Sequence, residues 1–507
     1  MKNNKVKKQA HDGETQTQDG EEVGQGLLDM NQAAALLKTS RPTFFRWVRA
    51  GKIRGAKAGR QWRFTREELD RFLKGQAPVV ALGADIKPLL CALAERLAQC
   101  GTTIATTSPV ANPVAEAVDR MIALTVAMKA SDVHVMPTLD AKGERQTVEI
   151  RYRVDGVLQP VATVDPRLLT PIIEQWKRLA ACNILEHRCP QDGRIIVNIR
   201  EQVYDLRVSF LPLCLGESVT ARVLSGHAPS LDLDGIGYTA PVKARIERAL
   251  RAWGMIVVTG PTGCGKTTTL YALARRLVSP KTKIVTIEDP VEYMLPGVAQ
   301  VQVMPAAGLS FIAALRAALR AAPNVVLIGE IRDQETLSLA QECALNGHLV
   351  LTALHTRDAA SALRRMLDIG SPAFHAGSAT KLVVAQRLIR TLCPQCSKPT
   401  TLSGTMLERV ERITREEGLD WGTLPRTFRQ AVGCKNCYGT GYRGRTVIAE
   451  ALEVTSEVAD ALERKATDDE LNALAVKQGM ISVAAHGMQR AAAGDTTVEE
   501  VLRFVAR

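Results

Sequence analysis

Aromatic residues and long hydrophobic runs are scarce in this sequence. Phe, Trp and Tyr make up 4% of the 507 residues, whereas hydrophobic residues as a whole make up 46%, so aliphatic side chains must form the cores. No run of about 18 uncharged apolar residues is present to cross a membrane, and the polar start lacks the apolar segment of a signal peptide. We therefore expect a cytoplasmic protein of about three domains, at roughly 150 residues per domain.

Cysteine is not scarce, but its 11 positions show no disulfide framework. Four of the cysteines form two C-x₂-C pairs, Cys393 with Cys396 and Cys434 with Cys437. Four thiolates on two tight turns are the donor set of a closed tetrahedral Zn²⁺ site. We predict a structural zinc ion, because such a site leaves no coordination position open for catalysis. The alternative is four unliganded thiols.

The N-terminal part of the chain is strongly basic. Residues 1–26 are polar without apolar periodicity and predict a disordered tail. Residues 27–75 predict two short helices joined by a tight turn, then a hairpin and a closing helix, with Ser40 and Pro42 at the start of the second helix. Residues 38–63 carry nine basic residues and no acidic one, and a segment of such uniform charge attracts polyanions. Its basic residues are Lys38, Arg41, Arg46, Arg49, Lys52, Arg54, Lys57, Arg60 and Arg63.

This order of elements resembles the winged helix-turn-helix of excisionase and MerR-type DNA-binding domains. Their Ala-Ala-x-x-Leu helix, Ser-Arg turn and R-x-W-R-F wing all occur here. The resemblance implies that Arg41, Thr43 and Arg46 face the major groove of double-stranded DNA, and that Arg60 and Arg63 approach phosphates from the wing. The alternative is a solvated basic face without a specific partner.

Residues 76–111 are predicted to be a linker between this domain and the rest of the chain. They contain one amphipathic helix, followed by a Thr-, Ser- and Pro-rich stretch. The apolar residues of this helix lie at helical spacing, at Ile86, Leu89, Leu90, Leu93 and Leu97. We expect the helix to pack on the domain that follows.

A phosphate-binding pattern lies in the second half of the chain. An apolar, β-branched run at 255–259 leads into G-x-x-x-x-G-K-[ST], with helical composition from Thr268 onward. The predicted nucleotide-binding residues are those of the pattern and the residue after it: Gly260, Pro261, Thr262, Gly263, Cys264, Gly265, Lys266, Thr267 and Thr268. Backbone N–H groups of such a loop converge on phosphates, the lysine reaches the outer phosphates and the threonine hydroxyl ligates Mg²⁺. These residues predict a site for ATP and Mg²⁺.

Three further apolar strands end in groups that suit phosphoryl transfer. One ends at Glu288, the next leads to Glu330 and the third leads to His355. We expect Glu288 to support Mg²⁺ and Glu330 to position or deprotonate water, because positioning dominates this chemistry. His355 would sense or polarise the γ-phosphate. Each group taken alone also fits an ordinary strand-end turn or a structural histidine.

These segments, in this order, resemble the motifs of the secretion ATPases of type II secretion and type IV pilus assembly. GPTGCGKTTT is similar to the family's Walker A, TIEDPVEY to its Asp box, NVVLIGEIRDQET to its Walker B and NGHLVLTALHTRDA to its His box. The resemblance implies a second N-terminal domain of the family at 112–230. It implies a RecA-like ATPase domain at 231–507, including a tetracysteine insert at 390–440 and a helical C-terminal subdomain.

The resemblance also implies how the site is completed. ATP would lie between the two domains of a ring, usually a hexamer, and arginines of the smaller domain would neutralise charge on the phosphates. The matching positions are Arg151 and Arg153, as nucleotide-binding residues, and Arg194 and Arg207, as catalytic residues. The alternative for each arginine is a surface salt bridge. The family has an acidic residue where this sequence has Met136. This difference removes no residue of the phosphate-binding loop and none that is directed at a metal ion.

The sequence thus predicts an α/β protein in which a RecA-like P-loop motor follows a small α+β domain and an N-terminal winged helix-turn-helix. The predicted function is a hexameric ATPase motor that assembles a type IV pilus or a type II secretion pseudopilus on an inner-membrane platform protein. In the family that the sequence resembles, a tetracysteine insert accompanies assembly and secretion motors more than retraction motors, so the resemblance implies an assembly motor. One alternative is a DNA-tethered regulatory or DNA-handling NTPase. Another makes the helix-turn-helix a protein adaptor for the motor.

Overall fold

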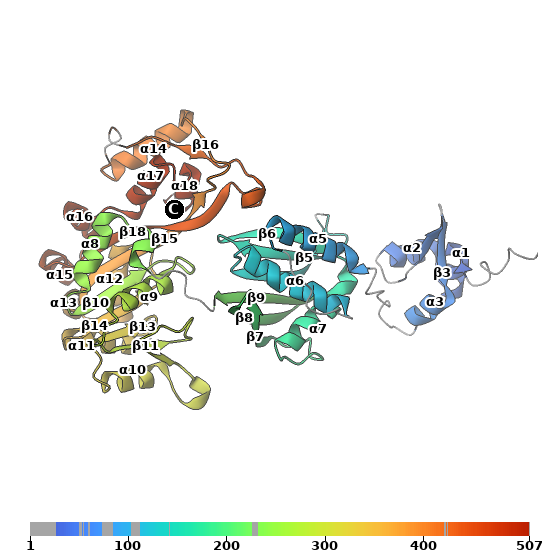
Figure 1. Cartoon of the computed structure of the whole chain (residues 1–507), viewed down its shortest axis with the longest axis horizontal. Coiled ribbons are helices and arrows are strands. Elements are labelled where there is room, and N and C mark those ends of the chain that lie inside the picture. The colour runs from blue at the N-terminus through green and yellow to red at the C-terminus, as the bar shows by residue number, and fades with distance from the viewer. Residues whose placement is uncertain are drawn as a thin grey trace, which may run out of the picture.

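A computed structural model describes the chain from Leu27 to Val505 (Figure 1). The residues outside the description are 1–26, 50–52, 54, 59–60, 74–84, 103–111, 141, 226–231, 420–421, 423 and 506–507. The predictions for the N-terminal tail and for Arg60 fall on these residues. The described strands form four sheets, with seven, six, three and two strands.

The N-terminal domain combines a three-stranded sheet with three helices. Its elements are β1 (Leu27–Leu28), α1 (Met30–Leu36), α2 (Arg41–Arg49), β2 (Ala56–Ala58), β3 (Gln61–Thr65) and α3 (Arg66–Leu73). Phe44 and Phe64 meet edge to face in its core, with ring centroids 4.9 Å apart. The Oγ of Ser40 accepts a hydrogen bond from the N–H of Thr43 at 3.4 Å, as expected for the start of α2. The predicted winged helix-turn-helix is present; strand β1, which pairs with β3, was not predicted.

A six-stranded antiparallel sheet, in the order β6-β5-β4-β9-β8-β7, forms the second unit, here called the arginine domain. Its strands are β4 (Asp132–Leu139), β5 (Gln146–Val154), β6 (Val157–Val164), β7 (Gln191–Ile199), β8 (Gln202–Leu213) and β9 (Gly216–Ser225). Its helices are α5 (Lys87–Gln99), α6 (Pro113–Ala127), η1 (Pro166–Leu168) and α7 (Leu169–Leu179). Side chains alternate between a buried face and a polar face, as the period of a strand requires. Leu89, Leu93 and Leu97 of α5 lie in the core of this domain, which confirms that the helix packs on the following domain.

The motor is built on a seven-stranded sheet in the order β12-β11-β13-β14-β10-β15-β18. Its strands are β10 (Gly254–Thr259), β11 (Ile284–Glu288), β12 (Ala299–Gln302), β13 (Val325–Ile328), β14 (Leu349–Leu354), β15 (Thr380–Leu392) and β18 (Tyr442–Glu453). Its helices are η2 (Leu233–Ile236), α8 (Ala240–Ala249), α9 (Lys266–Leu277), η3 (Pro305–Ala307), α10 (Phe311–Leu319), α11 (Gln334–Leu345), α12 (Ala359–Ile369) and α13 (Ala373–Ala379). All strand pairings are parallel except that of β15 with β18. The carboxyl ends of the parallel strands therefore meet at one edge, where open α/β sheets bind ligands.

The tetracysteine insert separates β15 from β18, and helices follow β18. The insert contains β16 (Lys398–Pro399), α14 (Gly404–Glu416), β17 (Arg429–Gln430) and η4 (Lys435–Cys437). The chain ends in α15 (Ser456–Glu463), α16 (Asp468–Lys477), α17 (Val483–Ala492) and α18 (Val498–Val505). Figure 1 shows the insert and the last two helices on one side of the motor sheet. The helical end of the chain is as the sequence predicts.

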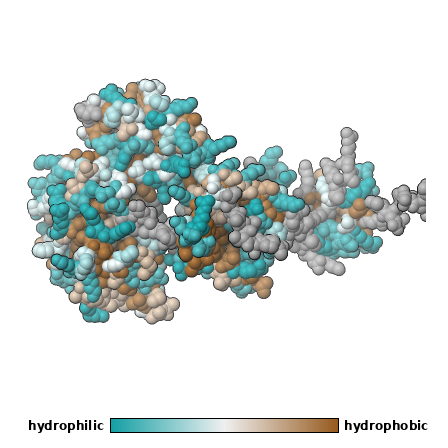
Figure 2. Space-filling model, viewed as in Figure 1, coloured by the Kyte–Doolittle hydropathy of each residue, from teal (hydrophilic) through white to brown (hydrophobic). Residues whose placement is uncertain are grey.

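The surface has a mixed character. Figure 2 shows hydrophilic and hydrophobic residues interspersed over the visible face, without a continuous hydrophobic belt across it. None of the helices in the described part of the chain is long and apolar enough to cross a lipid bilayer.

Candidate active site

The phosphate-binding loop joins β10 to α9 at the carboxyl edge of the motor sheet. Its three glycines, Gly260, Gly263 and Gly265, have φ angles of 148°, 78° and 89°, values that residues with a side chain rarely adopt. This backbone allows consecutive N–H groups to point to one side, ahead of the N-terminus of α9. Within the loop, Cys264 is buried, whereas four residues around the glycines are exposed. They are Pro261, Thr262, Thr267 and Thr268.

The loop is braced by the neighbouring strand β15, through a residue that the sequence motifs did not indicate. The Nε2 of Gln386 donates to the carbonyl of Cys264 at 2.9 Å, and its Oε1 accepts from the hydroxyl of Thr269 at 3.0 Å. A Cβ at Gly260 would lie 2.5 Å from the carbonyl oxygen of Gln386. The loop therefore fits against β15 only with glycine at its first position. The next residue, Arg387, contacts the carbonyl of Arg357 after β14.

Lys266, His355 and Glu330 form a chain of contacts beside the loop. The Nζ of Lys266 lies 3.4 Å from Nδ1 of His355, and Nε2 of His355 lies 2.8 Å from Oε2 of Glu330. Strand register explains this meeting, because β10 and β13 are both paired with β14, at whose end His355 follows. The structure thus brings together three of the predicted site residues. Lys266 also donates to the carbonyl of Gly260 at 2.9 Å.

Burial and neighbouring charges shift the pKa values of Glu330 and Lys266. Burial raises the pKa of Glu330, but hydrogen bonds from His355 and Arg332 outweigh it and hold the pKa below its ordinary value. Burial lowers the pKa of Lys266, against the opposing effect of nearby negative charge. Glu330 is therefore an ionised acceptor at neutral pH, which is the state that a water-positioning or general-base carboxylate requires.

Glu288 is placed differently from Glu330. Its side chain is 3% exposed and accepts hydrogen bonds from three interior groups: the hydroxyl of Tyr271, the hydroxyl of Thr286 at 2.6 Å and Nε2 of Gln300 at 3.1 Å. Two strands, β13 and β14, separate β11 from β10. The structure therefore does not bring Glu288 into contact with Lys266 or with the phosphate-binding loop, and its role as a Mg²⁺ ligand stays a prediction.

A row of arginines crosses the polar face of the arginine domain. Five residues occupy directly paired positions on neighbouring strands, in the order Arg153, Asp132, Arg222, Arg207 and Arg194. The buried Asp132 accepts from Arg222 at 3.0 Å and lies 3.2 Å from Arg153. Arg194 pairs with Asp205 at 2.7 Å, and Arg151, two residues before Arg153, pairs with Glu149. Three of the four predicted arginines thus form the salt bridges that the sequence left open as the alternative.

Arg207 differs from its neighbours in the row. It is exposed and makes no ion pair within 4.0 Å among the described residues. Its charge, with that of Arg222, acts instead on Glu292 in the motor, in the loop after β11; burial raises the pKa of Glu292 and the two arginines oppose this shift. Figure 1 shows β8 and β9, the strands of these two arginines, on the side of the arginine domain toward the motor. The sequence motifs did not indicate Arg222, because only the pairing of β9 with β8 aligns it with Arg207.

The four cysteines of the insert form one cluster. Their ligand atoms all lie within 4.8 Å of one another, with Sγ separations of 3.9 Å for Cys393 and Cys434 and 3.7 Å for Cys396 and Cys437. A tetrahedral Zn²⁺ ion with Zn–S bonds of about 2.3 Å needs sulfur atoms roughly 3.8 Å apart. Burial raises the pKa of Cys437, but N–H groups of Cys434 and Gly441 donate to its sulfur and bring the pKa down to about 7. The cluster fits a thiolate-bound metal ion.

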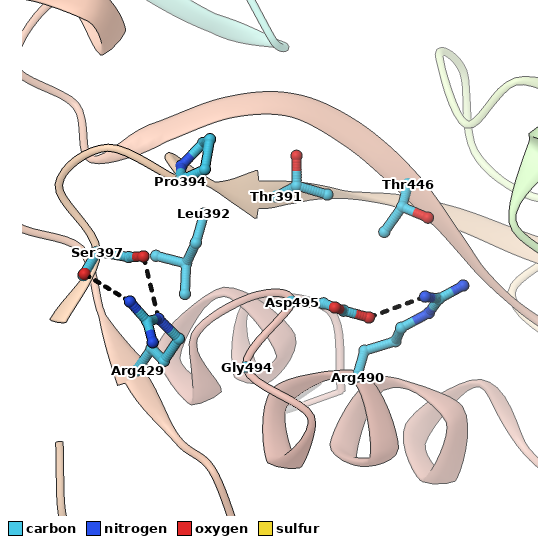
Figure 3. Close-up of a pocket in the computed structure, with 9 residues that line it drawn as sticks. All are labelled: Thr391, Leu392, Pro394, Ser397, Arg429, Thr446, Arg490, Gly494 and Asp495. Atoms are coloured by element: carbon cyan, nitrogen blue, oxygen red, sulfur yellow. Dashed lines mark hydrogen bonds and ion pairs between the residues drawn. The ribbon is translucent and has the colours of Figure 1, made fainter. Parts of the chain in front are cut away.

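A cavity of about 460 Å³ lies beside this insert, away from the phosphate-binding loop (Figure 3). Its polar lining is already paired: Arg490 contacts Asp495 at 2.8 Å, and Arg429 donates to the hydroxyl and the carbonyl of Ser397. The remaining lining residues are Thr391, Leu392, Pro394, Thr446 and Gly494. The N–H of Leu392 donates to the carbonyl of Asp495 at 2.9 Å, and this contact joins the end of β15 to the loop before α18.

The predicted DNA-contacting residues lie on two elements of the N-terminal domain. Arg41 and Arg46 of α2 are exposed, and Thr43 between them is half-buried, with its hydroxyl 2.9 Å from that of Ser40. Arg63 on β3 donates to the side chain of Gln61 at 2.8 Å.

The seven-stranded sheet, the glycine-rich loop at its carboxyl edge and the Lys266–His355–Glu330 chain define a P-loop ATPase with a RecA-like motor fold. The family model "Type II/IV secretion system protein" matches residues 108–503, and a helix-turn-helix model matches residues 27–77. The chain belongs to the type II/IV secretion system protein family, and it is an ATPase of the secretion type.

Three related proteins each match about three quarters of the chain. The "Putative type II secretion system protein E" of Escherichia coli K12 is 38% identical over 397 residues, covering 78% of each protein. "Type II secretion system protein HxcR" of Pseudomonas aeruginosa is 40% identical over 392 residues, covering 77% of each. "Type IV pilus assembly ATPase PilB" of Thermus thermophilus is 37% identical over 377 residues, which are 74% of this chain and 41% of PilB.

Solved structures share the fold. The ATPase DotB of Legionella pneumophila superposes with a TM-score of 0.55 at 20% identity, over 76% of this chain and 95% of DotB. The pilus retraction motor PilT with bound ADP superposes with a TM-score of 0.50 at 21% identity, over 76% of this chain and 95% of PilT. These likenesses extend across both the arginine domain and the motor, and at such identities they concern the fold.

Proposed function

We propose that the chain is a hexameric motor that uses ATP to assemble a type IV pilus or a type II secretion pseudopilus. It would act in the cytoplasm, bound to an inner-membrane platform protein. The observation that carries this proposal is that Lys266, His355 and Glu330 meet beside the phosphate-binding loop. The names of the relatives, which are secretion proteins and pilus assembly ATPases, support it.

In this proposal the residues divide the work of ATP hydrolysis. The loop amides and Lys266 bind the phosphates, and the ionised Glu330, held by His355, positions or deprotonates the attacking water. Arg207 has no acidic partner within ion-pair distance among the described residues, so its charge is available to the leaving phosphate. Mg²⁺ would be held by the exposed Thr267 hydroxyl with Glu288, and it would supply charge neutralisation. Glu288, which β13 and β14 separate from the strand before the loop, would have to give up its interior hydrogen bonds and move toward Thr267 to take part.

The tetracysteine cluster is proposed to hold a structural Zn²⁺ ion. The sulfur separations of 3.7–3.9 Å match a four-thiolate site. Metal analysis of the purified chain should give one zinc per chain. A double substitution, Cys434→Ser with Cys437→Ser, should remove it.

The ring is tested by light scattering on the full chain. With Mg²⁺ and a non-hydrolysable ATP analogue, we expect a mass six times the 55.0 kDa of one chain. The Lys266→Ala variant should stay smaller under the same conditions, because it binds the phosphates weakly. A wild-type protein that binds the analogue and remains a monomer would contradict the hexamer.

We propose further that the helix-turn-helix binds double-stranded DNA, because Arg41 and Arg46 are exposed on one helix. Affinity for a duplex should fall steeply between about 50 mM and about 200 mM salt as counterions are released. Arg41→Ala and Arg46→Ala should weaken binding, whereas Arg66→Ala at the exposed start of α3 serves as the control. Strong stimulation of ATP hydrolysis by the duplex would instead favour a DNA-handling NTPase. An absence of duplex binding would favour the adaptor role.

A further inference from the structure

The turn that carries Cys434 and Cys437, here called the metal knuckle, leads into a contact with the arginine domain. Tyr438 directly follows Cys437, and its hydroxyl lies 3.0 Å from the Sγ of Cys100, at the end of α5. The tyrosine packs against the hydrophobic core of the arginine domain. Figure 1 shows the insert reaching toward α5 and β6.

A second contact lies beside the first. Asp155, in the turn between β5 and β6, accepts a hydrogen bond from the N–H of Gly444 at 2.9 Å. Its other oxygen lies 3.9 Å from Arg445. Gly444 and Arg445 lie near the start of β18, which begins at Tyr442, and Asp155 follows Arg153 of the arginine row by two residues. The segment from Tyr438 to Arg445 therefore contacts the arginine domain at two places, one of them two residues from Arg153.

The conformation of Tyr438 depends on the knuckle. Its φ angle is 51°, a left-handed conformation that a residue with a side chain adopts only when its surroundings hold it there. The N–H of Gly439 donates to the carbonyl of Cys434 at 2.9 Å, and the N–H of Cys434 donates to the sulfur of Cys437 at 3.1 Å. A metal ion that joins four thiolates would fix this turn, and so the direction of the tyrosine ring.

We propose that the metal knuckle is a docking surface for the arginine domain, with Tyr438 as the positioning residue that sets the arginine row against the motor. The proposal rests on the proposed zinc site and on the proposed role of the arginines. Loss of the metal ion or of the aromatic ring of Tyr438 would release the arginine domain without altering the phosphate-binding loop.

Cysteine alkylation tests the docking directly. Cys100 is half-buried at the contact, Cys91 is exposed on the same helix and Cys343 is buried in the motor. In the zinc-loaded full chain, mass spectrometry should show fast alkylation of Cys91, slow alkylation of Cys100 and none of Cys343. Tyr438→Ala should speed alkylation of Cys100 at least tenfold and leave the other two unchanged. Tyr438→Phe, which keeps the ring, should stay close to the wild type.

Metal removal gives a second arm. Zinc-free protein should show the same fast alkylation of Cys100, while the buried Cys343 confirms that the motor is still folded. Equal rates for Cys100 and Cys91 in the zinc-loaded wild type, or an unchanged Cys100 rate in Tyr438→Ala, would overturn the docking surface.

Kinetics separate the docking from the role of the arginines. Tyr438→Ala should lower kcat for ATP several-fold with little change in KM, because the phosphate-binding loop is intact. If Cys100 becomes reactive in Tyr438→Ala while kcat stays at the wild-type value, the docking surface stands and the proposed role of the arginine row fails.

Discussion

The Nε2 of His355 lies 2.8 Å from the Oε2 of Glu330. With the contact from Arg332, this hydrogen bond holds the pKa of Glu330 below its ordinary value in spite of burial. The histidine therefore keeps the carboxylate ionised and fixes its direction. The pH dependence of hydrolysis should report this relationship.

Replacing His355 should move the acid limb of the kcat profile. In His355→Asn the carboxylate loses a hydrogen bond, so the pKa of Glu330 rises and activity is lost at a higher pH than in the wild type. At neutral pH we expect kcat to fall on the order of tenfold, since a hydrogen bond to a charged group contributes about 1.5 kcal/mol. The exposed His375→Asn is the matched control. An acid limb at an unchanged pH would show that His355 does not act on Glu330.

The first and second glycines of the phosphate-binding loop should differ in their tolerance of a side chain. Both have positive φ angles, but a Cβ at Gly260 meets backbone at 2.5 Å, whereas nothing lies within 4 Å of a Cβ at Gly263. Gly260→Ala should therefore lower the free energy of unfolding by about 1–3 kcal/mol more than Gly263→Ala. Urea denaturation measures the difference. Equal losses would mean that β15 yields to the loop.

Arg207 and Arg194 occupy paired positions on neighbouring strands but have different partners. Arg194 is held by Asp205, whereas Arg207 makes no ion pair within 4.0 Å among the described residues, and its charge opposes the rise in the pKa of Glu292. We expect Arg207→Ala to lower kcat on the order of 10²-fold, because an unpaired guanidinium is lost from a developing charge. Arg194→Ala should have a much smaller effect. Comparable losses in steady-state assays of the two variants would contradict this division.

His486 should make stability depend on pH. It is 1% exposed, its Nδ1 lies 3.0 Å from the backbone N of Ala449, and burial lowers its pKa from 6.5 to about 4. The unfolded chain therefore binds this proton more readily, and stability is lost as pH falls from 6.5 toward 4.

The His486→Gln variant isolates this effect. The buried Glu450, whose pKa is raised by burial to about 7, contributes a slope of opposite sign in both proteins. The difference in unfolding free energy between wild type and variant should thus change by up to ~3 kcal/mol between pH 7.5 and pH 4. A constant difference across this range would show that folding does not lower the pKa of His486.

Local motifs predicted the centre of the site because they are contiguous in sequence. The phosphate-binding loop and the strand that leads to His355 can be identified from their own residues. Gln386 and Arg222 could not be identified in this way, because their roles depend on which strands pair: Gln386 adjoins the loop through β15, and Arg222 joins the arginine row through β9. Glu288 illustrates the converse, since its position at a strand end did not indicate that Tyr271 holds it inside the motor.

Other parts of the chain show the same difference between local features and contacts that join distant segments. Ser40 and Pro42 predicted the start of α2 correctly, because a helix cap is a local property. The contact of Tyr438 with Cys100 joins segments more than 300 residues apart, and no periodicity in either segment indicates it.

Mg²⁺-dependent ATP hydrolysis by the full chain tests the central claim most directly. The claim is that Lys266 binds the phosphates and that Glu330 acts on the attacking water. We predict that Lys266→Ala and Glu330→Gln each lower kcat by roughly 10²-fold or more, while the exposed Lys281→Ala leaves it unchanged. Wild-type turnover in both site variants would contradict the account.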